Sequence, residues 1–329
     1  MSAPNYATEP STNAKRLTSL RDIPLSYKGV FLDQFGVLHD GTTPYPGAIE
    51  GVQYLADRGM KLLIISNSSR RSSGALDNLE RMGFPRDAFC GVITSGEVTH
   101  DALKNRRTQF WQSRKTCIHL TWGARGAISL ENLGIDVTLD PDEADCIIAH
   151  GTEALGTETT GTEAIPTSLE KIKTVLTACA ALRRQDGKSS IPMIVANPDV
   201  VTVHGTELRT MPGTLAKWYQ ELGGEVHLMG KPASVIYQGA LQMLDLPAEN
   251  VLAIGDSLEH DIAGAMGAGV DSLFVGGGIH AVELDVVQQG KIKITGSDDE
   301  GEGETGTLLS EVCHRFGAHP QFYIDYFAL

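Results

Sequence analysis

Residues 29–38 read GVFLDQFGVL and contain the first clear strand signal of the chain. An apolar run ends on the carboxylate of Asp33, and the chain then turns at Gly36. A strand interior disfavours a carboxylate, whereas ligand sites of open α/β sheets lie at the carboxyl ends of strands. The stretch therefore predicts a buried strand with a functional acid at its end.

Short β-rich runs and amphipathic stretches alternate on both sides of this point. The pattern predicts strands at 29–33 and 61–66 and helices at 46–59 and 74–83, the first of which begins with Pro and ends with Gly. Such a βαβα order predicts an α/β fold with a doubly wound parallel sheet. The continuous Ile, Leu and Val runs are typical of strands covered on both faces.

The same order returns late in the chain. Strands are expected at 225–230, 250–256 and 271–278, and helices at 234–245 and 259–269. A second α/β region lies between, with strands expected at 116–120, 145–150 and 192–196 and helices at 124–134, 167–185 and 213–224. We interpret residues 96–224 as a domain inserted into a core of residues 21–95 and 225–329, after a disordered tail of residues 1–20. Two sequential domains are the alternative.

Length and charge narrow the class of protein. A chain of 329 residues favours two domains. The net charge of −14 argues against a nucleic-acid partner, and the chain contains no apolar run long enough to span a membrane. The five scattered cysteines lack metal-ligand spacing, and the N-terminus lacks a secretory signal, so we expect a cytoplasmic protein with reduced thiols. The Gly- and acid-rich residues 295–307 predict a solvated loop.

Polar residues end three of the predicted strands, and a lysine follows a fourth. These residues are Asp33, Ser66, Asp256 and Lys231. A nucleophilic carboxylate, a hydroxyl, an ammonium group and a further acid are the components of a metal-assisted phosphoryl-transfer site. The alternatives are a helix cap for Ser66 and a surface position for Lys231.

Four motifs, in order, resemble those of the haloacid dehalogenase (HAD) superfamily. They are FLDQFGVL with Asp33, LLIISNSS with Ser66 and Asn67, GKP with Lys231, and IGDSLEHDIAGAMGAG with Asp256 and Asp261. Together with ANPD, which contains Asn197 and Asp199, the SNSS and GKP stretches resemble the NagD-like subfamily IIA, which includes p-nitrophenyl phosphatases. The resemblance implies a Rossmann-like core with a large α/β cap domain between the second and third motifs.

The resemblance also implies a hydrolase mechanism and the role of each residue. Asp33 would attack phosphorus to form an aspartyl-phosphate, while Ser66 and Lys231 would contact the phosphoryl group. Mg²⁺ would be held by Asp33, Asp256 and the backbone carbonyl of Phe35, and Asp261 would orient these ligands. The alternative for Asp261 is a cap or a salt bridge within its helix. Asn67, Asn197 and Asp199 would face a small phosphorylated substrate, with an Asx-Pro turn as the alternative for the last two. Caps of this kind suggest a homodimer by analogy.

The sequence departs from the family pattern at Phe35. Phosphatases of the superfamily usually carry a second aspartate there, which protonates the leaving group, and such general acid–base help is worth roughly 10²–10⁴ in rate. A sub-branch with an aromatic residue at this position matches the pattern. Either His39, Asp40 or His280 supplies the proton, or the leaving group needs none, or the protein is a catalytically weak sensor that binds a phosphometabolite. His39 and Asp40 also fit a simple loop turn.

Two further interpretations complete the prediction. Arg70 and Arg71 follow the second motif and would either steer an anion or lie solvated at the surface. A nicotinamide-dependent oxidoreductase is disfavoured, because no GxGxxG turn follows the first strand.

Overall fold

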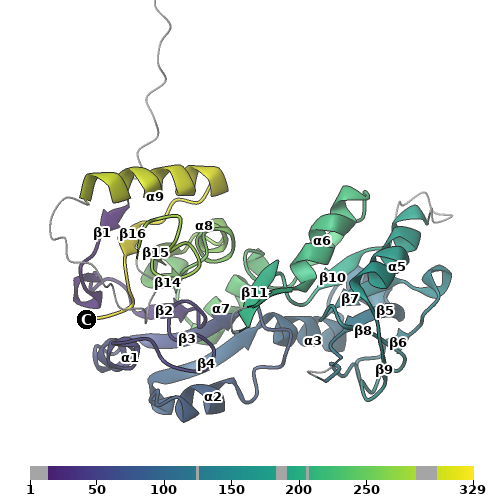
Figure 1. Cartoon of the computed structure of the whole chain (residues 1–329). Helices are drawn as coiled ribbons and strands as arrows, with labels where there is room; N and C mark the ends of the chain where they lie inside the picture. The colour runs from purple at the N-terminus through teal and green to yellow at the C-terminus, as the bar shows by residue number, and fades with distance from the viewer. Residues whose placement is uncertain (1–13, 124–125, 183–190, 205–206, 287–301) are drawn as a thin grey trace, which may run out of the picture. The chain divides into compact units, whose positions relative to one another are not determined.

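The structure is a computed structural model that describes residues 14–123, 126–182, 191–204, 207–286 and 302–329. The chain divides into two compact units, drawn in Figure 1. Unit 1 comprises residues 1–65, 75–92 and 240–329, and unit 2 comprises residues 66–74 and 93–239. The predicted boundaries at 95/96 and 224/225 stay a prediction.

The sheet of unit 1 has the strand order β1-β16-β15-β14-β2-β3-β4. Its strands are β1 (Lys15–Arg16), β2 (Gly29–Leu32), β3 (Lys61–Ser66), β4 (Phe89–Thr94), β14 (Val251–Gly255), β15 (Asp271–Val275) and β16 (Phe322–Ile324). The pairs from β1 to β3 are parallel, with Leu32 of β2 opposite Ile254 of β14 and Ile64 of β3. The central strands β2 and β14 are buried along their whole length, as the apolar runs predict.

Helices pack on this sheet through apolar stripes. They are α1 (Ala48–Asp57), α2 (Ala75–Arg81), α8 (Ala263–Gly267) and α9 (Glu302–Phe316), with short 3-10 turns at 20–22, 86–88 and 248–250 and a π turn at 258–262. Helix α7 (Ser234–Leu244) begins in unit 2 and ends in unit 1. Val52 and Leu55 of α1 lie in the main core cluster with Leu32 and Ile64. Val312 of α9 packs in a second cluster with Phe274 of β15 and Tyr323 of β16. The alternating β and α elements thus form the doubly wound layered fold that the sequence predicts.

Unit 2 has a sheet of its own, in the order β13-β10-β7-β5-β8-β9, with β6 paired to β5. Its strands are β5 (Thr116–Thr121), β6 (Asp136–Val137), β7 (Cys146–Ala149), β8 (Ala154–Gly156), β9 (Ala164–Pro166), β10 (Met193–Val195) and β13 (Val226–Leu228), and a separate hairpin pairs β11 (Val201–His204) with β12 (Glu207–Thr210). The helices are α3 (Ser95–Asn105), α4 (Gln109–Gln112), α5 (Leu169–Ala181) and α6 (Pro212–Glu221), with a 3-10 turn at 141–143.

Three expectations about individual elements are wrong. The strand expected at 225–230 pairs with β10 in the second sheet and not in the first, because periodicity identifies a strand but not its neighbour. The described residues of the expected helix at 124–134 form turns and coil, since Gly126 and Gly134 both adopt positive φ. Of the expected loop at 295–307, residues 302–307 belong to α9, and the rest lies outside the described residues.

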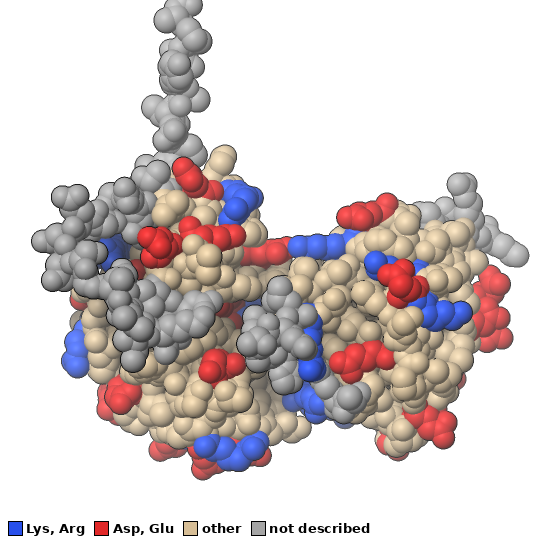
Figure 2. Space-filling model, viewed as in Figure 1, with Lys and Arg blue, Asp and Glu red and all other residues tan. Residues whose placement is uncertain are grey.

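The N-terminal expectation is also modified. Residues 1–13 lie outside the described residues, but Lys15 and Arg16 pair with β16, so the predicted tail does not extend to residue 20. The five cysteines are free thiols, as predicted. No helix within the described ranges is long and apolar enough to cross a membrane. Figure 2 shows Lys and Arg side chains interspersed with Asp and Glu on the visible face.

Candidate active site

Three carboxylates meet in unit 1. Asp33, Asp256 and Asp261 each offer an oxygen atom, and these atoms all lie within 4.8 Å of one another. Asp33 follows β2 and Asp256 follows β14, and these strands are parallel neighbours, so their carboxyl ends bring the two acids to one edge. The Asp33 N–H donates to the Ile254 carbonyl at 3.0 Å, which extends the pairing to the acid itself. We call these three residues the acid cluster.

Glycines make room for the acid cluster. A Cβ atom at Gly36, where φ is +79°, would lie 1.8 Å from Asp256 Oδ2, and one at Gly278 would lie 2.2 Å from the same atom. A Cβ atom at Gly255 would lie 2.2 Å from Asp261 Cγ. The backbone therefore approaches the carboxylates more closely than any other residue type allows.

The acid cluster has the chemistry of a hard-cation site. Asp256 and Asp261 are 6% and 3% exposed, and buried like charges this close are unfavourable unless a cation or a proton compensates them. Asp256 Oδ2 accepts from the Ile279 N–H at 2.8 Å, and Asp261 Oδ2 accepts from the Ser257 N–H at 3.1 Å. The second bond is of the helix-capping kind expected as the alternative for Asp261, yet the residue also belongs to the cluster. Oxygen ligands of this kind suit Mg²⁺.

The loop after Asp33 holds Phe35 in solvent and His39 in the core. Gln34 O accepts from the N–H groups of residues 37, 38 and 39, which forms a tight turn. Phe35 is 54% exposed, and its ring meets the edge of the His39 ring at a centroid distance of 4.9 Å. The ring also fills the space beside Gly41, where a Cβ atom would lie 2.8 Å from Phe35 Cε1.

The two titratable residues of this loop both accept hydrogen bonds within it, although the buried Nε2 of His39 has no partner in the described part of the chain. His39 is buried, and its Nδ1 accepts from the Gly41 N–H at 3.0 Å, so the proton sits on Nε2. Burial lowers the pKa of His39 to about 4, against the opposing charge of Asp40. For Asp40, desolvation opposes ionisation, but hydrogen bonds from Thr43 and Thr42 outweigh it and lower the pKa to about 2. The loop-turn interpretation of both residues is thus the one that the geometry supports.

His280, the third candidate proton donor, is held on both ring nitrogens. Nε2 accepts from the Leu258 N–H at 3.4 Å, so Nδ1 carries the proton that it donates to Glu283 Oε2 at 3.1 Å. The ring is 7% exposed and packs on Phe274 and Phe316. Its contacts are those of a structural residue.

Tyr45 is a residue near the acid cluster that the sequence does not single out. Burial, and then the charges of Asp256 and Asp40, raise the pKa of the Tyr45 hydroxyl to about 12. Tyrosines are common in the loops that precede helices. The position of Tyr45 in the sequence therefore does not reveal its electrostatic interaction with Asp256 and Asp40.

A second cluster lies in unit 2 and is organised by Asn67. The buried Asn67 amide donates to Asp199 Oδ1 at 2.8 Å and to the Lys231 carbonyl at 3.1 Å, and its Oδ1 accepts from the Lys231 N–H at 2.7 Å. A Cβ atom at Gly230 would lie 2.4 Å from Asn67 Oδ1, so the glycine of the GKP motif permits this approach. Residues from three motifs are therefore joined by one side chain, and Lys231 is buried rather than at the surface.

The remaining predicted residues of unit 2 are placed by local turns. Ser66 ends β3 and is buried, and its Oγ accepts from the Ser68 N–H at 3.3 Å, so it begins a turn and not a helix. Asn197 Oδ1 accepts from the Asp199 N–H at 3.0 Å, which is the Asx turn expected as the alternative for this pair. Their contacts with a substrate stay predictions.

A cavity of about 430 Å³ lies within unit 2, beside the segment that follows the second motif. Ser69, Arg70, Arg71 and His150 contribute to its wall. Arg71 makes a bidentate ion pair with Glu97, with two contacts of 2.7 Å, so much of its charge is neutralised. The buried His150 Nδ1 lies 3.1 Å from His119 Nε2, and burial lowers the pKa values of both rings. The volume is in the range of small-ligand pockets.

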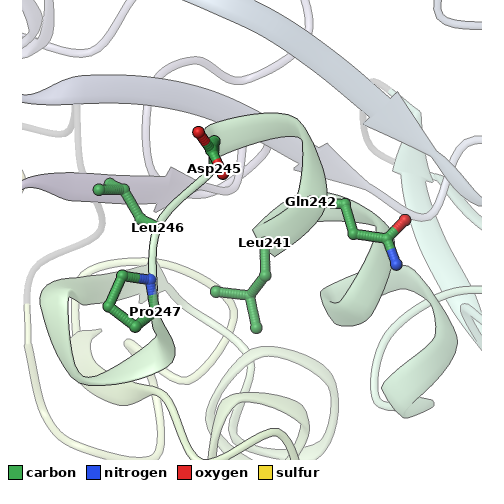
Figure 3. Close-up of a pocket in the computed structure, with 5 residues that line it drawn as sticks. All are labelled: Leu241, Gln242, Asp245, Leu246 and Pro247. Atoms are coloured by element: carbon green, nitrogen blue, oxygen red, sulfur yellow. The ribbon is translucent and has the colours of Figure 1, made fainter.

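A shallower pocket lies at the end of α7 (Figure 3). Figure 3 labels the five residues that line it, which are Leu241, Gln242, Asp245, Leu246 and Pro247. None of these five residues belongs to the acid cluster or to the group joined by Asn67, so the pocket supplies no group to either.

Comparisons with known proteins agree with this geometry. Residues 30–136 match a haloacid dehalogenase-like hydrolase family, and residues 228–292 match a HAD-hydrolase-like family. The 5'-nucleotidase YutF of Bacillus subtilis is 25% identical over 260 residues, which cover 77% of this chain and 89% of the relative. An acid sugar phosphatase of Staphylococcus aureus is 24% identical over 262 residues, covering 78% and 89%.

Solved structures give the same answer. A haloacid dehalogenase-like hydrolase from Brucella suis superposes with a TM-score of 0.64 at 26% identity, covering 81% of this chain and 92% of the other. NagD from E. coli shares the fold with a TM-score of 0.58 at 20% identity, covering 92% and 97%. The predicted aromatic sub-branch is not tested by these matches. With its acid cluster at the ends of β2 and β14 and its two matched hydrolase regions, this chain belongs to the haloacid dehalogenase superfamily.

Proposed function

We propose that this protein is a Mg²⁺-dependent phosphomonoester hydrolase that acts on a small phosphorylated metabolite through an aspartyl-phosphate on Asp33. The observation that carries the proposal is the acid cluster, in which three carboxylate oxygens lie within 4.8 Å at the ends of parallel strands. The relatives that are named phosphatases or a nucleotidase support the same class of reaction.

Asp33 suits the part of the nucleophile. It is the least buried member of the acid cluster, and a carboxylate is ionised at neutral pH. Its oxygen forms a bond to phosphorus as the bond from phosphorus to the leaving oxygen breaks, and water then releases phosphate from the acyl phosphate. Asp33, Asp256 and the Phe35 carbonyl would hold Mg²⁺, and Asp261 would orient those ligands. When bound, Mg²⁺ supplies positive charge that offsets the repulsion between phosphate and carboxylate.

The proposal assigns the phosphoryl group two further contacts, the Ser66 hydroxyl and the Lys231 ammonium group. The register of β2 and β3 supports the first, because Leu32 lies opposite Ile64, and Asp33 and Ser66 follow one and two residues later. The hydrogen bonds of Asn67 support the second, because they hold the backbone of Lys231 on both sides. Asn67 thereby acts as a positioning residue for Lys231, while its contact with substrate, like those of Asn197 and Asp199, stays a prediction.

The experiment is a rapid-mixing assay of p-nitrophenyl phosphate with Mg²⁺. Because Phe35 cannot activate water, we expect release of the acyl phosphate to be slow and a burst of about one p-nitrophenolate per active site to precede the steady state. Asp33→Asn should abolish both the burst and the steady rate. Lys231→Met should lower the rate by about 10²-fold or more, whereas Lys104→Met, on an exposed lysine of α3, should leave it unchanged.

Other outcomes would contradict the proposal. Equal turnover by the wild type and Asp33→Asn would remove Asp33 from the mechanism. Binding of phosphorylated compounds without turnover of any of them would instead favour the sensor that the sequence leaves open. The homodimer and the lack of nucleic-acid and membrane partners stay predictions.

A further inference from the structure

The exposed ring of Phe35 is unusual for its setting. It stands two residues from Asp33 in a loop whose later side chains, Val37, Leu38 and His39, are buried. The tight turn at Gln34 and the space left by Gly41 hold the ring in place, so its exposure follows from the loop's hydrogen bonds and packing. An exposed apolar ring two residues from a nucleophile, held by the hydrogen bonds of its loop, is a surface for a ligand to cover.

The three candidate proton donors are either buried or hydrogen-bonded within the fold. His39 Nδ1 accepts from the Gly41 N–H, and its Nε2 has no hydrogen-bond partner among the described residues but lies in a ring that is 1% exposed, so no leaving oxygen can reach it. Asp40 accepts hydrogen bonds from the N–H and hydroxyl groups of Thr42 and Thr43 on the same loop. His280 uses both ring nitrogens. Of the candidates that the sequence suggests, none can protonate a leaving group.

We propose that the substrate is a phosphate ester of an aryl, heteroaryl or enol hydroxyl, whose flat leaving group packs on the exposed face of Phe35 and departs as an oxyanion without a proton from the loop. This inference rests on the proposed function and specifies its substrate class. The P–O bond breaks with its electron pair on the leaving oxygen while Asp33 bonds to phosphorus. Water later returns the carboxylate and releases inorganic phosphate, so the net reaction consumes one water.

The chemistry favours this class over two others. A phenolate is a weak base, because its conjugate acid has a pKa near 10 or below. An alkyl or sugar alkoxide is a far stronger base, so an alkoxide leaving group needs a proton donor. Cleavage of a phosphoanhydride releases a phosphate that leaves without a proton. That phosphate needs cationic partners, whereas Phe35 offers an apolar face. An aromatic leaving group matches both the missing proton and the ring.

The test uses the full-length protein with Mg²⁺ and a series of ring-substituted phenyl phosphates, whose leaving-group pKa values run from about 5 to about 10. For the wild type, kcat/KM should fall by at least about 10²-fold across the series, and glycerol phosphate should react more slowly still. Phe35→Asp, which introduces a carboxylic acid, should flatten this dependence by raising the slow end.

Three variants separate the parts of the inference. Phe35→Ala should raise KM for phenyl phosphates by about three- to tenfold, and Phe35→Leu should do so less, because stacking is lost in both but apolar contact only in the first. Tyr45→Phe should leave the leaving-group dependence unchanged. If Tyr45→Phe instead slows alkyl phosphates alone, Tyr45 is a proton donor and the inference is wrong.

The outcomes distinguish this inference from the function on which it rests. A flat dependence in the wild type, with turnover lost in Asp33→Asn, would overturn the substrate class and leave the phosphatase intact. If neither the wild type nor Asp33→Asn turned over any ester, the substrate class and the phosphatase function would both be overturned. If Phe35→Asp does not fold, the wild-type slope and the KM values of Phe35→Ala still decide.

Discussion

Removing one carboxylate from the acid cluster should stabilise the metal-free protein. Two unit charges 4.8 Å apart repel by about 3.5 kcal/mol at an effective dielectric constant of about 20, and Asp33 takes part in two such pairs. Proton uptake and mobile ions relieve part of this repulsion. We therefore expect Asp33→Asn to raise the free energy of unfolding in EDTA at pH 7 and low salt by about 1–3 kcal/mol.

Magnesium should reverse the order of stabilities. A ligand at 100 times its Kd stabilises the folded state by about 2.7 kcal/mol, and the wild type should gain this amount while Asp33→Asn gains much less. Calorimetry or far-UV circular dichroism is the suitable readout, because the acid cluster lies in unit 1 and the tryptophans at 111, 122 and 218 all lie in unit 2.

The matched control removes a charge from the surface of the same unit. Asp87→Asn, at an exposed position after α2, should change neither the stability in EDTA nor the response to Mg²⁺. If Asp33→Asn were less stable than the wild type in EDTA and responded equally to Mg²⁺, two conclusions would follow. The acid cluster would not be destabilised by charge repulsion, and it would not be a cation site.

Further predictions concern the glycines, the buried histidines and Asn67. Gly36→Ala should lower both Mg²⁺ affinity and turnover by at least about tenfold, because the new Cβ would meet Asp256, whereas Gly59→Ala, at a similar φ of +77° with nothing within 4 Å, should cost only the backbone strain of about 1 kcal/mol. The pKa of His119 is about 4 in the folded protein and about 6.5 when unfolded, so its stabilising contribution is complete above pH 6.5 and is lost as the pH falls towards 4, by up to about 3 kcal/mol. Urea unfolding followed by tryptophan fluorescence should show this loss of stability. His119→Phe should reduce the loss, whereas the control His227→Gln, at a half-exposed site, should not. A urea midpoint that does not change with pH would contradict the prediction. Asn67→Ala should lower turnover by at least about 10²-fold, and Asn67→Asp should restore less than half of it because a carboxylate cannot donate to Asp199; unchanged steady-state rates would remove Asn67 as the positioning residue.

The sequence was sufficient for the features that depend on local pattern. The apolar runs at 29–32 and 251–255 become neighbouring central strands, and parallel pairing then places Asp33 beside Asp256 without further information. The same reasoning places Lys231 after a strand. It could not assign that strand to the second sheet, because both sheets bury similar Val and Leu residues and the choice depends on long-range packing.

Other features depend on contacts that no pattern encodes. Asn67 belongs to the second motif, but its bonds to Asp199 and Lys231 join residues 132 and 164 positions away. The burial of His39 and the exposure of Phe35 are set by one turn at Gln34, and alternation along the sequence would not have assigned them. The electrostatic link between Tyr45 and Asp256 is likewise visible only in three dimensions.

The strand order of unit 1 has a consequence for synthesis on the ribosome. β2 ends at Leu32, and its central neighbour β14 begins at Val251, 219 residues later. The nascent chain must therefore carry an unpaired hydrophobic strand edge through most of translation, while every residue of unit 2 has already been synthesised by Gly239. The acid cluster assembles only in the final stage of elongation, so translation-arrested chains ending near residue 245 should be bound by chaperones and devoid of hydrolase activity.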